Sequence, residues 1–370
     1  MQLMAIDNGK RNLLKLGALS LVSPGLLGGC AMTQQRLTFE GSQDRAPKLI
    51  GGAIRTAGGY EAVVASQNGQ PVHHLPLPQR GHGVAIRPGS QTAVVFGRRP
   101  GTYAMVLNYQ SGQMETLIPA SPSRHFYGHG VYSLDGHWLY ATEGETASSR
   151  GVIGVYDAQR GYQKVEEFTD FGIGPHEIIV MSDGTLVVGV GGVHTDGRTP
   201  LNLISMVPSL SYLSPSGAVL EQVGLSDTHK SIRHLAHDGA DTVLTGQQYR
   251  GESDRYVPLV AMHKRGESMQ ELGGEPEDWA RFKHYIASIA ANDSHIVATS
   301  PRGNCYGVWD KNTKQLLEVN VLPDASGVVV KNDHFFISSG AGRMVEITPR
   351  LTKHIKSSPT QWDNHWHMIT

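Results

Sequence analysis

Five histidines recur at one position of a repeated sequence pattern. The pattern is a short apolar strand with a titratable or hydroxyl side chain at its start, as in RGHGVAIRP, YGHGVYSLD, GPHEIIVMS and IRHLAHDGA. It returns as IASIAANDS, DASGVVVKN and the C-terminal WDNHWHMIT. The residues that share the position are His82, His129, His176, His234, Ser288, Ser326 and His365. With 18 histidines in 370 residues, five at one register are not explained by composition.

Imidazoles that converge from such positions suit a transition metal. Neutral imidazole binds Zn, Cu, Fe and Ni, and three or four rings leave a coordination position open on the serine side. Crowded imidazoles also lower one another's pKa, which keeps them neutral near pH 7. We therefore predict that the histidines hold Fe, Cu or Zn. The alternatives are histidines that brace neighbouring sheets or line a polar channel, and histidines that act as acid or base.

The repeats themselves predict the fold. The aligned positions recur every 38 to 58 residues, and an apolar run follows each about ten residues later. A third strand and usually a fourth complete each repeat, which is the pattern of β-propeller blades. One four-stranded sheet cannot bury both faces, so the blades must stack around an axis.

The two ends of the chain together supply one more blade. Residues 48–76 contain three apolar runs without a histidine-bearing strand, and WDNHWHMIT provides that strand. We predict an all-β, seven-bladed β-propeller over residues 46–370, closed by the C-terminal strand beside the N-terminal blade. The long insert VHTDGRTPLNLISMVPSL is the segment that could change this count of seven blades.

The first strand of each propeller blade lines the central channel, so the aligned residues are expected to form a ring there. Loops after the second strands add polar residues near the channel mouth, although such loops are usually only solvated. His367 is expected to point away from His365. The second group of candidates is Glu143, His194, Arg99, Arg198, Tyr249, Ser288 and Ser326.

The N-terminus has the features of an export signal. Residues 1–29 combine Lys10 and Arg11 with a short apolar stretch, and LGGC resembles a lipoprotein cleavage site at which Cys30 is acylated. The basic segment also resembles a twin-arginine signal, with the ordinary secretory route as the alternative. We expect residues 30–45 to be a linker and the protein to be anchored in the periplasm, with Ala31 favouring the outer membrane.

The overall composition narrows the possible partners. The 32 basic and 33 acidic residues nearly cancel, so no broad basic surface for nucleic acid is expected. After Cys30, Cys305 is the single remaining cysteine and cannot form an internal disulfide. We expect it to be an inert, partly buried thiol, and the protein to be a monomer.

Several longer segments resemble the bacterial DUF1513 family. They are HGVYSLDGHWLYATEGE, GVIGVYDA, LNLISMVPSLSYLSPSG, GQQYRG, PLVAMH and WDNHW, and the resemblance covers about residues 45 to 370. It implies an exported seven-bladed propeller grouped with imelysin-like, iron-linked periplasmic proteins. The family has no assigned activity, so it implies no catalytic residues.

Three functions agree with these features. The first is a periplasm-facing lipoprotein that binds a transition metal through the channel histidines and supports iron or copper acquisition, with iron-related periplasmic proteins as partners. The second is a lactonase-like hydrolase, in which a histidine is the base and Arg99 or Arg198 holds a carboxylate. Glu143 is its closest candidate carboxylate. The third is a scaffold whose propeller face binds another protein.

Overall fold

The computed structural model describes residues 46–55, 58–197 and 199–369. The predictions for the signal segment 1–29, the lipid-attachment residue Cys30 and the linker 30–45 fall outside these residues, as does Arg198. Within the described ranges, no helix is long and apolar enough to cross a membrane.

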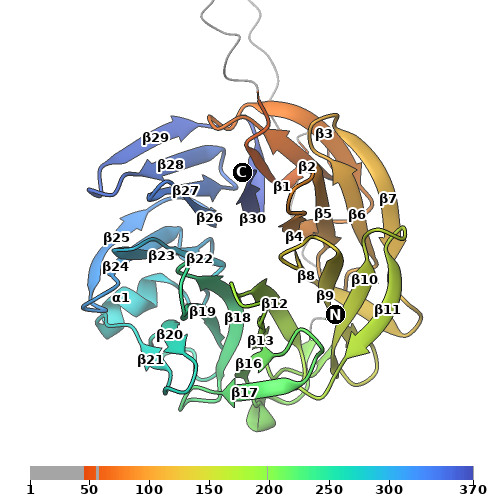
Figure 1. The fold of residues 1–370 in the computed structure, drawn as a ribbon. Coiled ribbons are helices and arrows are strands. Elements are labelled where there is room, and N and C mark those ends of the chain that lie inside the picture. The colour runs from red at the N-terminus through yellow and green to blue at the C-terminus, as the bar shows by residue number, and fades with distance from the viewer. Residues whose placement is uncertain (1–45, 56–57, 198, 370) are drawn as a thin grey trace, which may run out of the picture. The chain divides into compact units, whose positions relative to one another are not determined.

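Seven four-stranded antiparallel sheets are arranged around a central axis (Figure 1), which confirms the predicted propeller. The innermost strands are β4 (Gly81–Ile86), β8 (Arg124–Tyr132), β12 (Pro175–Val180), β18 (Lys230–His237), β22 (Ser288–Ala291), β26 (Ala325–Lys331) and β30 (Gln361–Met368). The second strands are β5 (Thr92–Gly97), β9 (Trp138–Glu145), β13 (Leu186–Val190), β19 (Thr242–Tyr249), β23 (His295–Ser300), β27 (His334–Ser339) and β1 (Leu49–Ile54).

The outer halves of the blades follow the same order. The third strands are β6 (Tyr103–Asn108), β10 (Gly151–Asp157), β16 (Ser209–Leu213), β20 (Val260–Lys264), β24 (Cys305–Asp310), β28 (Arg343–Ile347) and β2 (Tyr60–Ala65). The outermost strands are β7 (Gln113–Pro119), β11 (Gln163–Phe168), β17 (Val219–Val223), β21 (Gln270–Glu271), β25 (Leu316–Val321), β29 (Lys353–Ser357) and β3 (Pro71–Leu77).

The C-terminal strand closes the ring as predicted. β30 pairs with β1 in antiparallel register, with Leu49 opposite Met368. An ion pair then ties this blade to the next one, because the Arg80 guanidinium donates to both carboxylate oxygens of Asp363 at 2.5 and 2.7 Å. Closure gives β1 a partner, so the blade built from both ends of the chain has four strands like the others.

The long insert does not add a blade. It contains the short strands β14 (Thr195–Asp196) and β15 (Thr199–Pro200) and the 3-10 turn η1 (Leu203–Ser205), while β13 pairs directly with β16. A second irregular connection holds the helix α1 (Pro276–Arg281), which the sequence pattern did not predict. Its Trp279 is buried and stacks on Trp309 at 5.6 Å between ring centroids.

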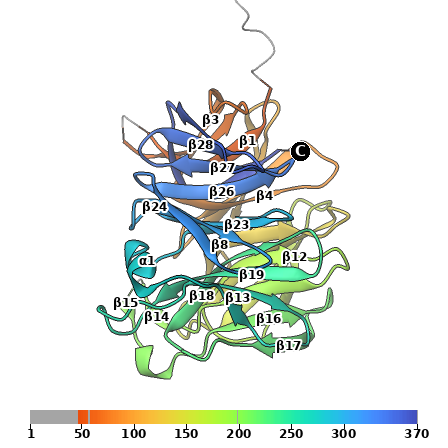
Figure 2. The ribbon, with the colours of Figure 1, turned by 90° about the vertical axis from the view of Figure 1, so that its left-hand side faces the viewer.

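The core lies between adjacent blades. In the layer between the β4–β7 blade and the β8–β11 blade, Phe96, Phe126 and Leu139 are fully buried. The second and third strands are covered on both faces, which explains why they appear in the sequence as continuous apolar runs rather than alternating ones. The side view in Figure 2 shows the blades stacked one after another.

Irregular pairing occurs where the aligned histidines lie. Between β4 and β5 the register shifts between Gly81 and Val84, which brackets His82. Equivalent shifts bracket or adjoin His129, His176 and His234. The β30 side of its pairing with β1 skips from Trp362 to Trp366, so His365 also lies in a bulge. A bulge re-aims side chains that simple alternation would place on the blade faces.

Candidate metal centre in the propeller channel

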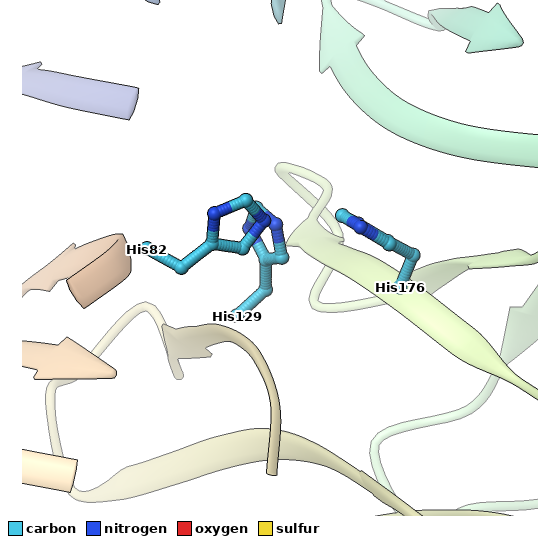
Figure 3. A group of neighbouring side chains, drawn as sticks. All are labelled: His82, His129 and His176. Atoms are coloured by element: carbon cyan, nitrogen blue, oxygen red, sulfur yellow. The ribbon is translucent and has the colours of Figure 1, made fainter. Parts of the chain in front are cut away.

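The five predicted histidines meet in one cluster. Ring centroids of His82 lie 4.7 Å from His129 and 4.6 Å from His365. His176 and His234 are 4.8 Å apart, and His234 and His365 are also 4.8 Å apart. Figure 3 shows three of these side chains, His82, His129 and His176, directed toward one another from different strands. The sequence register therefore identified residues that are in contact across five blades.

Close approach of the backbones makes this cluster possible. Gly128 has φ of +104°, and a Cβ there would lie 2.8 Å from the His82 ring. A Cβ on Gly83 would lie 2.6 Å from the Gly128 carbonyl oxygen and 2.8 Å from Nδ1 of His129. The glycines that flank the histidines in the sequence are thus needed for space, and at Gly128 also for backbone conformation.

Each of the five rings has one buried nitrogen that makes no hydrogen bond with the described residues. These atoms are Nε2 of His129, His234 and His365, and Nδ1 of His82 and His176. Four of the residues are buried, and His176 is partly exposed. Buried polar atoms are normally satisfied, so five unpartnered nitrogens at one place are candidate ligand atoms.

Burial keeps these imidazoles neutral. It lowers the pKa of His82, His129 and His176 well below the ordinary value, and the neighbouring rings add to the effect. Burial likewise lowers the pKa of His234 and of His365 to about 3. Neutral imidazole carries the lone pair that a metal requires.

Glu177 is a site residue that sequence reasoning missed. Its carboxylate lies 3.3 Å from Nδ1 of His234 and 3.7 Å from Nδ1 of His129, and accepts a hydrogen bond from the backbone N–H of Leu235. Burial raises its pKa, against the opposing influence of His365. A carboxylate on Nδ1 fixes the tautomer that leaves Nε2 unprotonated, the usual outer support of a metal-binding histidine. Its one sequence signal is its place directly after His176.

The prediction for His367 was wrong. His365 and His367 line the same cavity of about 360 Å³, together with Glu177. Glu177 and His367 also line an adjacent cavity of about 480 Å³ that reaches His129. His367 also acts electrostatically on His129 and His365, so it lies near the cluster at this end of the channel.

Two overlapping triads could accept a metal ion. In His129, His234 and His365, and likewise in His82, His129 and His176, the ligand atoms all lie within 4.8 Å of one another. Tetrahedral Zn–N bonds of 2.0–2.1 Å would separate the nitrogens by roughly 3.3 Å. The first triad fits better, because all three of its residues are buried, whereas His176 of the second is partly exposed.

The two serines of the ring have other contacts. The Ser288 hydroxyl accepts a hydrogen bond from the backbone N–H of Val328 in the next blade, and the Ser326 hydroxyl donates to the Asp324 carbonyl. They lie on the innermost strands as predicted, but these contacts are structural.

The second group of candidates is dispersed. Glu143 is buried inside its own blade, where its carboxylate accepts hydrogen bonds from Tyr156 at 2.5 Å and Lys164 at 2.7 Å. Nδ1 of His194 lies 3.1 Å from the Ser149 hydroxyl in the insert region. Tyr249 packs against His284. None of these three belongs to the histidine cluster, whereas Arg99 lines a cavity that also reaches His82 and His176.

The free cysteine behaves as expected for an inert thiol. Cys305 is buried, and burial raises its pKa to about 11. A thiol that stays protonated at neutral pH is a poor nucleophile and a poor metal ligand.

Comparison with protein-family models identifies the family of this chain. The model for the protein family of unknown function DUF1513 matches residues 75–369. The chain belongs to the DUF1513 family. All seven ring positions of this DUF1513 protein, from His82 to His365, fall within the matched residues.

Solved structures with the same architecture are distant in sequence. Hydrazine synthase from Kuenenia stuttgartiensis is 13% identical, with a TM-score of 0.59, over 81% of this chain and 89% of that chain. The structure of U3-55K is 14% identical, with a TM-score of 0.55, over 80% of this chain and 82% of that chain. A comparison with curated proteins gave no match. At these identities the likeness concerns the fold alone.

Proposed function

We propose that this DUF1513 protein binds a transition metal ion in its channel, with Nε2 of His129, His234 and His365 as the ligands. The observation that carries the proposal is the set of orphaned imidazole nitrogens that converge in a buried cluster. A ligand set of imidazoles alone suits Fe, Cu or Zn. Three protein ligands leave a coordination position open.

The alternative of blade bracing has less support. A histidine that braces two blades would use its ring nitrogens for hydrogen bonds to the neighbouring blade. His263 does this elsewhere in the described chain, where its Nδ1 is hydrogen-bonded to the Tyr212 hydroxyl. The five channel histidines instead keep one nitrogen each without a partner. Leaving a buried polar atom unsatisfied costs about 1–3 kcal/mol, so an arrangement that does this five times favours an external ligand.

A cellular role can be proposed from the N-terminal sequence and the family. We infer a lipoprotein, attached through Cys30 and facing the periplasm, that supports iron or copper acquisition. The export-like residues 1–29 and the iron-linked context implied by the family support this role. Imidazole ligands are compatible with either metal.

Metal analysis of the purified full chain tests the proposal. After incubation with Fe, Cu or Zn and removal of excess metal, we expect about one ion per chain with at least one of the three. His129→Ala combined with His365→Ala should abolish retention while the far-UV spectrum and cooperative unfolding are kept. His354→Ala, which changes an exposed histidine on β29, is the matched control and should bind as the unmodified chain does. Absence of retained metal with all three ions would refute the proposal.

A hydrolase is the second candidate, because Arg99 shares a cavity with His82 and His176. The carboxylate expected to assist it, Glu143, is engaged with Tyr156 and Lys164 instead. Turnover of a lactone panel that persists with chelator and is lost in His176→Ala would favour this function over metal binding.

A further inference from the structure

The channel has a second mouth of different chemistry. A cavity of about 80 Å³ reaches His82 and His176 from the starts of the inner strands, whereas the cavities at Glu177 and His367 adjoin later residues of those strands. Its lining includes five arginines and no acidic side chain among the described residues. The arginines are Arg98, Arg99, Arg233, Arg250 and Arg302. We call this cavity the arginine mouth.

The arginines are brought together by the ring closure rather than by the sequence. Arg98 and Arg99 follow β5, Arg233 and Arg250 belong to the β18–β21 blade, and Arg302 follows β23. Three blades therefore contribute the charge. The chain as a whole has a formal net charge of −1, so the arginine mouth is a local concentration of positive charge.

Arg233 is the residue that points most directly to a ligand. It is 3% exposed, and its buried Nε–H has no hydrogen-bond partner among the described residues. Arg99 and Arg250 line the same cavity, so two further guanidinium groups lie near this buried cation. A buried cation among like charges is costly unless an anion compensates it.

Aromatic rings hold two of the other guanidinium groups in place. Arg302 lies over the Tyr285 ring at 4.3 Å, and Arg99 lies 5.7 Å from the centre of the Tyr127 ring. Stacking of this kind orients the planar donor fork before a ligand arrives.

We propose that the arginine mouth binds one small tetrahedral oxyanion of the phosphate or sulfate class. Arginine forks bind such oxygens by paired, charge-assisted hydrogen bonds. The cavity is small, about 80 Å³, and is lined by five arginines, which suits a single small oxyanion. The proposal goes beyond metal binding and does not depend on it, because it uses the guanidinium groups and none of the orphaned imidazole nitrogens.

Titration of the metal-free full chain with inorganic phosphate tests this site. Calorimetry should show saturable binding of one phosphate per chain, and the thermal midpoint should rise more than in chloride of equal ionic strength. Sulfate should compete with phosphate. Chelator is present throughout, so failure or success here is independent of the metal result.

Two variants separate binding from folding. Arg233→Met removes an uncompensated buried charge, so the ligand-free midpoint should rise or stay unchanged while the phosphate-induced shift is lost. Arg302→Gln changes an exposed residue and should raise the dissociation constant about tenfold or more. Arg350→Gln, in the exposed turn after β28, is the control. A phosphate response no greater than that to chloride, or unchanged phosphate binding in both mouth variants, would overturn the proposal.

Discussion

Acidification should destabilise the metal-free propeller steeply, because the buried histidines stay neutral in the fold but take up protons when the chain unfolds. Burial lowers the pKa of His82, His129, His234 and His365 far below the value of about 6.5 expected in the unfolded chain. The unfolded state therefore binds more protons below pH 6.5, and the free energy of unfolding must fall as the pH falls.

The magnitude follows from the number of buried rings. Each of these four groups costs about 1.4 kcal/mol for a change from pH 7.5 to 5.5, so together they cost about 5 kcal/mol. Burial also lowers the pKa of His125, to about 4, and of His367, and both add to the loss. His176 is partly exposed and is left out of this sum. Glu177, whose pKa is raised by burial, acts in the opposite direction but through one group only. A loss of about 5 kcal/mol is comparable to the whole stability of many domains.

Urea unfolding of the metal-free chain at pH 7.5 and 5.5 measures this loss. His365→Asn should reduce the difference between the two pH values by about 1.4 kcal/mol, since one proton-binding group is removed. His354→Asn, at an exposed position, should leave the difference unchanged. A difference of less than about 2 kcal/mol in the unmodified chain would show that the cluster is hydrated or already protonated, which contradicts its buried, neutral state.

Three further substitutions test the contacts around the channel. Glu177→Gln should weaken metal binding by about 10- to 100-fold in a chelator competition and should not lower the stability of the metal-free chain. The control, Glu346→Gln at a surface His–Glu pair, should leave both metal binding and stability unchanged. Gly128→Ala should lower the free energy of unfolding by about 1–3 kcal/mol in urea, because of the positive φ and the contact with the His82 ring; an unchanged midpoint would contradict this close approach. Arg80→Ala should cost about 3–5 kcal/mol by the same measurement, because it leaves Asp363 buried without its cation; a loss below 1 kcal/mol would show that Asp363 is hydrated.

The sequence determined the architecture and the membership of the histidine cluster. Propeller blades repeat, so apolar runs at fixed distances from each aligned residue predicted seven blades and the closure by β30. Equivalent positions of repeated blades lie at equivalent distances from the axis. A shared register was therefore sufficient to predict that His82, His129, His176, His234 and His365 would meet.

Only the tertiary structure decided where neighbouring residues point. Simple alternation places Glu177 opposite to His176, yet a shift in the register between Pro175 and Ile178 directs both into the channel. A bulge depends on the pairing of two strands and has no local sequence code of its own. The arginine mouth is similar, since Arg99, Arg233 and Arg302 come from three blades at unrelated repeat positions. Their proximity results from ring closure, which no spacing along the chain records.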